Sequence, residues 1–152
     1  MKPLLSIVIP SNNRTELLDE AIVSITTDPG WSMDCELCIS DNSEGDETGD
    51  LVRNKYSHDP RIIYRRSLDS PSLDENVNAA ISMANGEYVW IFGDDDLIVE
   101  NFMGEFIAYL QNSSPDIVIL NSCSFQEQEQ VEASRMTLDN LKVYGLNDNN
   151  SF

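Results

Sequence analysis

Three consecutive carboxylates, Asp94, Asp95 and Asp96, are the side chains of this sequence whose types and spacing best suit chemistry. They follow Gly93 and an apolar run of strand-forming residues at positions 88–92. A run that is apolar on both faces predicts a central, buried strand in a parallel sheet. Because open α/β sheets bind ligands beyond the carboxyl ends of their strands, we expect these carboxylates to lie at a binding site.

Adjacent carboxylates repel one another and raise one another's pKa, so the acid triplet needs a compensating cation. Mg²⁺ and Mn²⁺ are natural candidates, because these ions prefer oxygen ligands and commonly also bind the phosphate groups of a substrate. The alternative interpretation is a solvated acidic turn that favours the start of the helix after it. The triplet alone is compatible with both interpretations.

The composition of this 152-residue chain is ordinary for a globular protein of about one domain, except for a formal net charge of −18. This charge argues against nucleic acid and anionic membrane surfaces as partners, since both require basic patches. No apolar run reaches the length of a transmembrane helix or of a signal-peptide core. Three cysteines, an odd number, in a chain without a secretion signal indicate reduced thiols and a cytoplasmic location.

Cys35 and Cys38 have the spacing of a redox or zinc pair, but they fall inside a strand-like run. Alternation along a strand points two residues at this spacing to opposite faces. We therefore expect both to be buried structural cysteines. The single histidine, His58, lies in a polar loop, so the sequence offers no Ser-His-Asp or Cys-His catalytic set.

The elements that must position the acid triplet follow from the pattern of apolar residues. Strands are expected at residues 4–9, 35–40, 61–65, 88–92 and 116–120. Helices are expected between them, at residues 15–27, 47–56, 73–84 and 100–112. This alternation predicts an α/β fold with a doubly wound, mostly parallel, Rossmann-like sheet and helices on both faces.

Several helix ends are marked in the sequence. Asn13 with Glu16 resembles a capping box for the first helix, and Ser72 is a good N-cap for the third. Gly86 suits the C-cap of the third helix, which should bury one apolar stripe. The stripe consists of Leu73, Val77, Ala80, Ile81 and Ala84.

Polar clusters follow the first, second and fourth expected strands, at residues 10–14, 41–43 and 94–96. Right-handed crossovers bring the three clusters to the same edge of the sheet. Three clusters at the binding edge, one of them a carboxylate triplet, indicate a site for a phosphate-bearing ligand and a metal ion. Neither G-x-G-x-x-G nor a Walker sequence is present, which disfavours a dinucleotide-binding or P-loop protein.

Taken in order, these clusters closely resemble the nucleotide-sugar half of family-2 glycosyltransferases with the GT-A fold. The resemblance covers about residues 4–125. It rests on Leu-Ser-Ile-Val-Ile-Pro-Ser-Asn-Asn-Arg at 5–14, Ile-Ser-Asp-Asn-Ser at 39–43, and the stretch from Asn78 through Gly-Glu-Tyr at 86–88 to the acid triplet. The form Trp-Ile-Phe-Gly-Asp-Asp-Asp at 90–96 is similar to the branch that includes abequosyltransferases of O-antigen synthesis.

The resemblance implies a role for each matching residue. Pro10 and Ser11 would hold the nucleobase through main-chain contacts, and Asp41 would accept a hydrogen bond from the base. Asp94 would contact the ribose. The other residues implied in binding the nucleotide sugar are Asn12, Arg14, Asn42 and Asn78.

The same resemblance implies that Asp95 coordinates a Mn²⁺ or Mg²⁺ ion that bridges the diphosphate, with Asp96 as a second candidate ligand. Such an ion neutralises the departing nucleoside diphosphate, so that an acceptor hydroxyl can displace it in line. The sequence departs from the family in two places. Asn12 replaces an aromatic residue that commonly stacks on the base, and Gly93 replaces the first aspartate of the family's DxD motif.

By this resemblance, residues 1–125 form the nucleotide-sugar-binding domain of an inverting glycosyltransferase, and residues 126–152 begin a truncated or absent acceptor-side segment. The general base is expected beyond Phe152, so the catalytic residue stays unknown and this chain alone is expected to lack it. The partners would be a nucleotide-diphosphate sugar and a saccharide or lipid-linked acceptor in cell-surface polysaccharide or O-antigen synthesis. The protein would act in the cytoplasm or at the inner face of the membrane, with its oligomeric state left open.

Two other functions stay open on the residues. A sugar nucleotidyltransferase on a related fold would need a glycine-rich, basic loop after the first strand, and residues 10–14 contain no glycine. A non-catalytic metal- or nucleotide-binding module would keep the binding residues without a general base. The sugar, the acceptor, the linkage and the nucleobase are not defined by the sequence.

Overall fold

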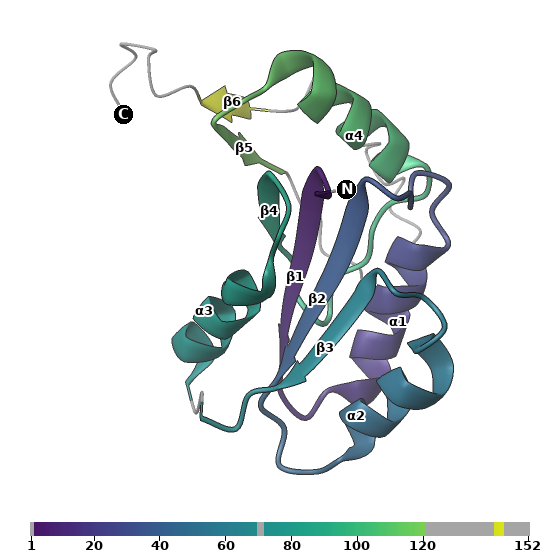
Figure 1. The fold of residues 1–152 in the computed structure, drawn as a ribbon, viewed down its shortest axis with the longest axis vertical. Coiled ribbons are helices and arrows are strands. Elements are labelled where there is room, and N and C mark those ends of the chain that lie inside the picture. The colour runs from purple at the N-terminus through teal and green to yellow at the C-terminus, as the bar shows by residue number, and fades with distance from the viewer. Residues whose placement is uncertain (1, 70–71, 121–141, 145–152) are drawn as a thin grey trace, which may run out of the picture.

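The computed structural model describes residues 2–69, 72–120 and 142–144, and its centre is a four-stranded parallel sheet (Figure 1). The strands lie in the order β3-β2-β1-β4. Their bounds are Leu5–Ser11 for β1, Cys35–Asp41 for β2, Ile62–Arg66 for β3 and Tyr88–Ile91 for β4. A separate antiparallel pair is formed by β5 (Ile117–Ile119) and β6 (Lys142–Tyr144).

Helices cover both faces of the parallel sheet (Figure 1), which confirms the predicted α/β fold class. On one face, Leu18 of the first helix and Met103 of the last belong to the larger core together with Ile7 of β1. On the other face, Ala80 of the third helix packs with Val8. The helices are α1 (Thr15–Thr26), α2 (Glu47–Leu51), the π-helical turn η1 (Val52–Tyr56), α3 (Leu73–Met83) and α4 (Phe102–Ser113).

The register of the strands brings their carboxyl ends together. β1 and β2 pair along their full lengths, from Leu5 opposite Cys35 to Ser11 opposite Asp41. β4 runs parallel on the other side of β1. The loops that follow β1, β2 and β4 therefore leave the sheet from one edge, as right-handed crossovers predict.

Two expectations about the strands are wrong. β4 is not central, because among the described residues it is the end strand of the parallel sheet. One of its faces is open, since Val89 is 43% exposed and Ile91 is 54% exposed, while Trp90 on the other face packs edge-on against Phe92. β5 pairs with β6 instead of extending the parallel sheet. An apolar run shows that both faces of a strand are suited to burial. It does not show whether another helix or strand covers each face.

The helix ends agree with the sequence at α3 and differ at α1. Ser72 and Glu75 form a capping box, in which the Ser72 hydroxyl accepts the Glu75 N–H at 3.3 Å and the Glu75 carboxylate accepts the Ser72 N–H at 3.1 Å. The box expected from Asn13 is wrong, because the N-cap of α1 is Arg14 and no side chain caps it. Asn13 instead turns its carboxamide oxygen to the Glu44 N–H, at 3.1 Å.

The expected apolar stripe of α3 is confirmed only in part. Ala80 is buried and Ala84 packs against the same core, but Leu73 and Ile81 are exposed and Asn76 is buried instead. Gly86 is not the C-cap glycine, because the C-cap is Ala84 in an extended conformation. A Cβ at position 86 would lie 2.6 Å from the Ser6 nitrogen, so glycine is required there by the close approach of β1.

The cysteine expectation is confirmed. Cys35 and Cys38 are both buried and free, and they belong to cores on opposite faces of the sheet. Burial, together with Glu36, raises the pKa of the Cys38 thiol to about 12, which does not suit a redox or metal-binding pair. None of the helices in the described part of the chain is long and apolar enough to cross a membrane. The domain boundary expected near residue 125 lies outside the described residues.

Candidate functional site

The loops after β1, β2 and β4 meet at the carboxyl edge of the sheet. The Ser11 hydroxyl donates to Asp94 Oδ2 at 3.0 Å, and the Asn42 N–H donates to the Ser11 carbonyl at 3.1 Å. Pro10 precedes this contact in β1, opposite Ser40 of β2. The prediction that the three polar clusters share one edge is therefore confirmed.

Arg14 joins the first cluster to the acid triplet. Its Nη1 atom lies 3.1 Å from Asp94 Oδ1 and 3.0 Å from Asp95 Oδ2. The Asp94 side chain is 9% exposed, whereas those of Arg14 and Asp95 are 51% and 53% exposed. Asp94, and then Asp95, raise the pKa of Arg14 above its ordinary value. Part of the compensating charge that the triplet needs thus comes from the chain itself.

Asp96 does not share the contact that Arg14 makes with Asp94 and Asp95. Its Oδ2 accepts the Gly93 N–H at 3.2 Å and closes a tight turn. A Cβ at position 93 would lie 2.6 Å from that oxygen, so a side chain there would displace the Asp96 carboxylate. Because α4 begins only at Phe102, Asp96 is not in its first turn. The interpretation that the triplet favours the start of this helix is therefore wrong.

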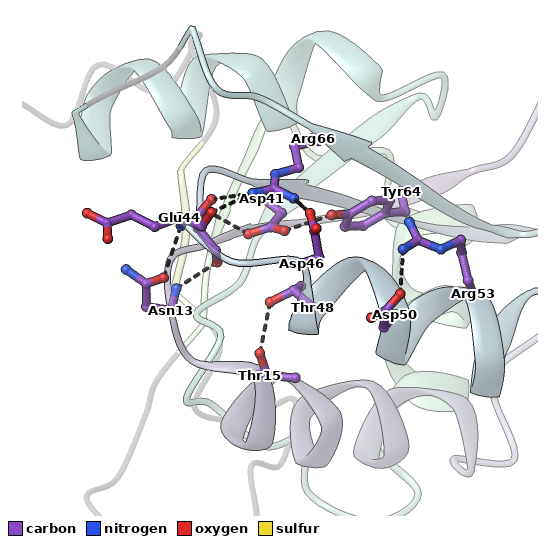
Figure 2. A network of polar contacts seen from close by, with 11 residues as sticks. Asn13, Thr15, Asp41, Glu44, Asp46, Thr48, Asp50, Arg53, Tyr64 and Arg66 are labelled. Atoms are coloured by element: carbon purple, nitrogen blue, oxygen red, sulfur yellow. Dashed lines mark hydrogen bonds and ion pairs between the residues drawn. The ribbon is translucent and has the colours of Figure 1, made fainter.

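Asp41 is fully buried and anchors the loop after β2. Its Oδ1 accepts the Ser43 N–H at 2.9 Å, and its Oδ2 accepts the Tyr64 hydroxyl at 2.7 Å (Figure 2). Burial and the Asp41 carboxylate raise the pKa of Tyr64, which keeps this phenol a hydrogen-bond donor. Asn13 reaches the same loop, since its N–H donates to Ser43 Oγ at 2.7 Å.

Arg66, at the end of β3, fixes this loop from the other side, a role that the sequence reasoning missed. Its Nη2 donates to the carbonyls of Ser43 and Glu44 at 3.0 and 2.9 Å, and its Nη1 pairs with Asp46 (Figure 2). Below the loop, the hydroxyls of Thr15 and Thr48 lie 3.0 Å apart and link α1 to α2. The loop that carries Asn42 is therefore rigidly placed at the site.

A chain of amides lines the same edge, and its centre is a residue that the sequence reasoning did not select. Asn76 of α3 is buried and donates to the Ser11 carbonyl and to Asn42 Oδ1, both at 3.1 Å. Asn12 donates to the same Asn42 oxygen at 2.9 Å. Asn78 lies on the exposed side of α3, because positions two apart on a helix face in nearly opposite directions. The structure thus does not bring Asn78 to the other candidates.

The acid pair fits a divalent ion that is shared with a ligand. Asp94 Oδ1 and Asp95 Oδ2 face one cationic nitrogen, so two carboxylate oxygens converge where a cation can lie. Within residues 2–69 and 72–120, no group of three or more His, Cys, Asp or Glu residues is placed to hold a metal. Mg²⁺ commonly uses only one or two carboxylates and completes its shell with water and phosphate oxygens. The convergent oxygens belong to Asp94 and Asp95, while Asp96 as a metal ligand stays a prediction.

These features define a doubly wound α/β domain with its ligand site at the carboxyl edge of the sheet. The family model for glycosyl transferase family 2 matches residues 6–150. Abequosyltransferase RfbV of Salmonella typhimurium is 35% identical over 153 residues, which cover 96% of this chain and 45% of that protein. The GalNAc(5)-diNAcBac-PP-undecaprenol beta-1,3-glucosyltransferase of Campylobacter jejuni is 35% identical over 95 residues, or 62% of this chain and 30% of that protein. The chain belongs to glycosyl transferase family 2 and spans less than half the length of these two relatives.

Solved structures share the fold at lower identity. Residues 1–349 of S. aureus TarS, in complex with UDP, match with a TM-score of 0.68 at 21% identity, over 86% of this chain and 38% of that one. The mannosyltransferase PcManGT from Pyrobaculum calidifontis, in complex with GDP-Man and Mn²⁺, matches with a TM-score of 0.63 at 20% identity, over 76% and 34%. The GT-A fold expected from the resemblance is therefore confirmed.

Proposed function

We propose that this chain supplies the donor-binding part of a metal-dependent, inverting glycosyltransferase. One observation carries the proposal: Ser11 and Arg14 bond to Asp94 and Asp95, about 80 residues further along the chain, at the carboxyl edge of a parallel sheet. The family membership and the UDP complex of the structurally similar TarS support a nucleotide sugar as the ligand.

In this proposal, Pro10 and Ser11 hold the nucleobase through their main chain, and Asp41 accepts a hydrogen bond from it. Asp41 already accepts bonds from Ser43 and Tyr64. An ionised carboxylate has about four acceptor positions, but Asp41 is fully buried, so a bond to the nucleobase requires the loop after β2 to shift.

The polar surface proposed to lie beside the nucleobase is made of amide side chains. Asn12 stands where the family commonly has an aromatic residue, and its carboxamide is fixed by its bond to Asn42. Asn76 holds the same Asn42 oxygen from within the protein. The nucleobase would therefore contact hydrogen-bonding groups at this position rather than an aromatic ring.

Asp94 would contact the ribose and also share Mn²⁺ or Mg²⁺ with Asp95, with Asp96 as a further candidate ligand. The bound ion would neutralise the nucleoside diphosphate that leaves the sugar. Arg14 adds a planar set of N–H donors that suits phosphate oxygens. None of the described residues is proposed as the general base that deprotonates the acceptor hydroxyl.

The wider role follows from the relatives. A 35% identity to the abequosyltransferase of Salmonella typhimurium supports transfer in O-antigen or another cell-surface polysaccharide synthesis. The acceptor would be a saccharide or a lipid-linked saccharide, and the site of action the cytoplasm or the inner face of the membrane. Residues 1–125 are proposed as the donor-binding domain.

Calorimetric titration of this chain with UDP, GDP, CDP, ADP and dTDP tests the proposal. At least one of these nucleoside diphosphates should bind in the presence of Mn²⁺, and binding should disappear in chelator, because a diphosphate beside carboxylates is repelled unless a cation lies between them. Undiminished binding in chelator would remove the metal from the proposal. Binding of none of the five with Mn²⁺ would overturn it.

A further inference from the structure

Arg14 occupies the position of the cation that the acid pair requires. One of its nitrogens, Nη1, makes both contacts, with Asp94 Oδ1 and with Asp95 Oδ2. We propose that Arg14 is an exchangeable internal counter-ion, which neutralises Asp94 and Asp95 in the ligand-free site and moves to the donor's phosphates when a divalent ion takes the carboxylates. This inference rests on the proposed function and deepens it.

The contact itself argues for competition. The two carboxylate oxygens that converge on Arg14 are the ones that a divalent ion would use. A divalent ion and the Arg14 guanidinium would repel each other if both contacted these oxygens. The repulsion is strong where the surroundings are partly buried, as they are at Asp94. A divalent ion therefore binds the acid pair only after Arg14 has left it.

Arg14 is also attached loosely enough to exchange. Arg61 provides the contrast, because it bonds to Asp59 through Nε and Nη2, stacks over Trp31 at 4.5 Å and is only 22% exposed. Within the described residues, the side-chain hydrogen bonds of Arg14 go to these two carboxylates, both through one nitrogen. The guanidinium is half exposed, so solvent screens its pairing with the two carboxylates and weakens its attachment to them.

The remaining donors of Arg14 can receive a phosphate. A guanidinium has five N–H donors in a planar fork that matches phosphate oxygens. When the diphosphate and the metal arrive together, the metal replaces Arg14 on the carboxylates and the phosphates replace the carboxylates on Arg14. Every charge stays paired in this exchange, so metal and diphosphate should bind with positive coupling.

The test measures the binding of Mn²⁺ alone and of pyrophosphate with Mn²⁺, by electron paramagnetic resonance of free Mn²⁺ and by calorimetry. Arg14→Gln removes the competitor, so Mn²⁺ alone should bind about fivefold more tightly or better, while pyrophosphate with Mn²⁺ should bind about tenfold more weakly. These opposite signs separate an exchangeable counter-ion from a residue that only supports the fold. Arg14→Lys keeps the charge, so its affinity for Mn²⁺ alone should stay within about twofold of the parent chain.

Arg53→Gln is the matched control. Arg53 pairs with Asp50 on the surface, with both side chains 62% exposed, and the substitution changes the net charge by the same amount as Arg14→Gln. An equal gain in Mn²⁺ affinity in Arg53→Gln would show a general charge effect and overturn the inference. Unchanged or weaker Mn²⁺ binding in Arg14→Gln would overturn it while leaving the proposed function intact. If the parent chain binds no nucleoside diphosphate with Mn²⁺, both proposals are wrong.

Discussion

Buried carboxylates lie near both ends of the parallel sheet, and their hydrogen-bond partners are of different kinds. Near the amino ends of the strands, Glu36 accepts the Ser6 hydroxyl and the Asn85 N–H, each at 2.6 Å. At the carboxyl ends, Asp94 accepts the Ser11 hydroxyl at 3.0 Å and the exposed guanidinium of Arg14 at 3.1 Å. The partners of Glu36 are neutral groups, whereas one partner of Asp94 is the half-exposed cation of Arg14.

This difference separates a structural carboxylate from one that can take a ligand. The Glu36 contacts tie β1 and β2 to the connection between α3 and β4, where the Gly86 N–H also donates to the Ser6 hydroxyl at 2.7 Å. Removing any side chain of that network would leave a buried polar group without its hydrogen-bond partner. At the other edge, Arg14 can leave if another cation replaces it. The predictions below test whether stability depends on one edge and binding on the other.

The largest effect is expected from Asp95→Asn. An amide is nearly isosteric with the carboxylate but lacks the charge that a hard cation requires. Metal-dependent nucleotide binding should weaken by more than about 100-fold, since even residues outside the ligand shell affect metal affinity by 10–100-fold. Melting temperature without metal should hold or rise slightly, because the lost pair with Arg14 is exposed and repulsion within the triplet falls.

Calorimetry and thermal melting of Asp95→Asn and of Asp50→Asn check this prediction. Asp50 is also exposed and paired with an arginine, but it lies on α2, away from the acid triplet. Asp50→Asn should leave nucleotide binding unchanged. If both variants bind equally well, Asp95 is not the metal ligand.

A comparable loss, but in stability, is expected from Glu36→Ala. The substitution leaves the Ser6 hydroxyl and the Asn85 N–H without their acceptor, and each unsatisfied buried group costs about 1–3 kcal/mol. The free energy of unfolding in urea should fall by about 2 kcal/mol or more. The affinity of the folded protein for nucleotide with Mn²⁺ should not change.

Glu36→Gln is the control for this edge. It keeps an oxygen that can accept both bonds, so it should lose less stability than Glu36→Ala. A selective loss of nucleotide binding in either variant, with the free energy of unfolding intact, would contradict the division between the two edges.

The sequence predicted the strands and the shared edge because these depend on local patterns and on chain chirality. Apolar runs give β1 and β2 to within two residues at each end, and right-handed crossovers then place the loops after them together. The partner of the acid triplet was not predictable in this way. Arg14 and Asp94 are 80 residues apart, and no periodicity relates a turn cation to a distant carboxylate.

The choice between Asn76 and Asn78 shows a second limit. The family resemblance placed Asn78 at the site, but α3 buries Asn76 and leaves Asn78 exposed. The burial of a polar side chain depends on partners from other elements, here Ser11, Ser40 and Asn42. An apolar pattern contains no information about such partners.

A smaller, mixed effect is expected from Asn76→Ala. The variant loses bonds to the Ser11 carbonyl and to Asn42, and it leaves Ser40 with one acceptor fewer. The free energy of unfolding should fall by about 1–2 kcal/mol. Nucleotide affinity should fall severalfold because the base-side groups lose their orientation, while the affinity for Mn²⁺ alone should stay the same.

Asn78→Ala is the comparison, since Asn78 lies on the exposed side of the same helix. It should change the free energy of unfolding by less than about 0.5 kcal/mol and leave nucleotide affinity unchanged. A greater loss of nucleotide affinity in Asn78→Ala than in Asn76→Ala would restore Asn78 as the binding residue.

The smallest effect is expected from Asp96→Asn. The amide oxygen can accept the Gly93 N–H as the carboxylate does, so the turn that presents Asp94 and Asp95 should persist. Only one exposed charge is lost beside the metal position, and screening by solvent should limit the change in Mn²⁺ affinity to about threefold.

Asp96→Ala removes the turn contact as well and should weaken Mn²⁺ binding further, although it removes the same charge. If Asp96→Asn loses as much Mn²⁺ affinity as Asp95→Asn, the two carboxylates share the ion and Asp96 leaves Gly93 on binding. The division of the triplet into a ligand pair and a turn-closing residue would then be wrong.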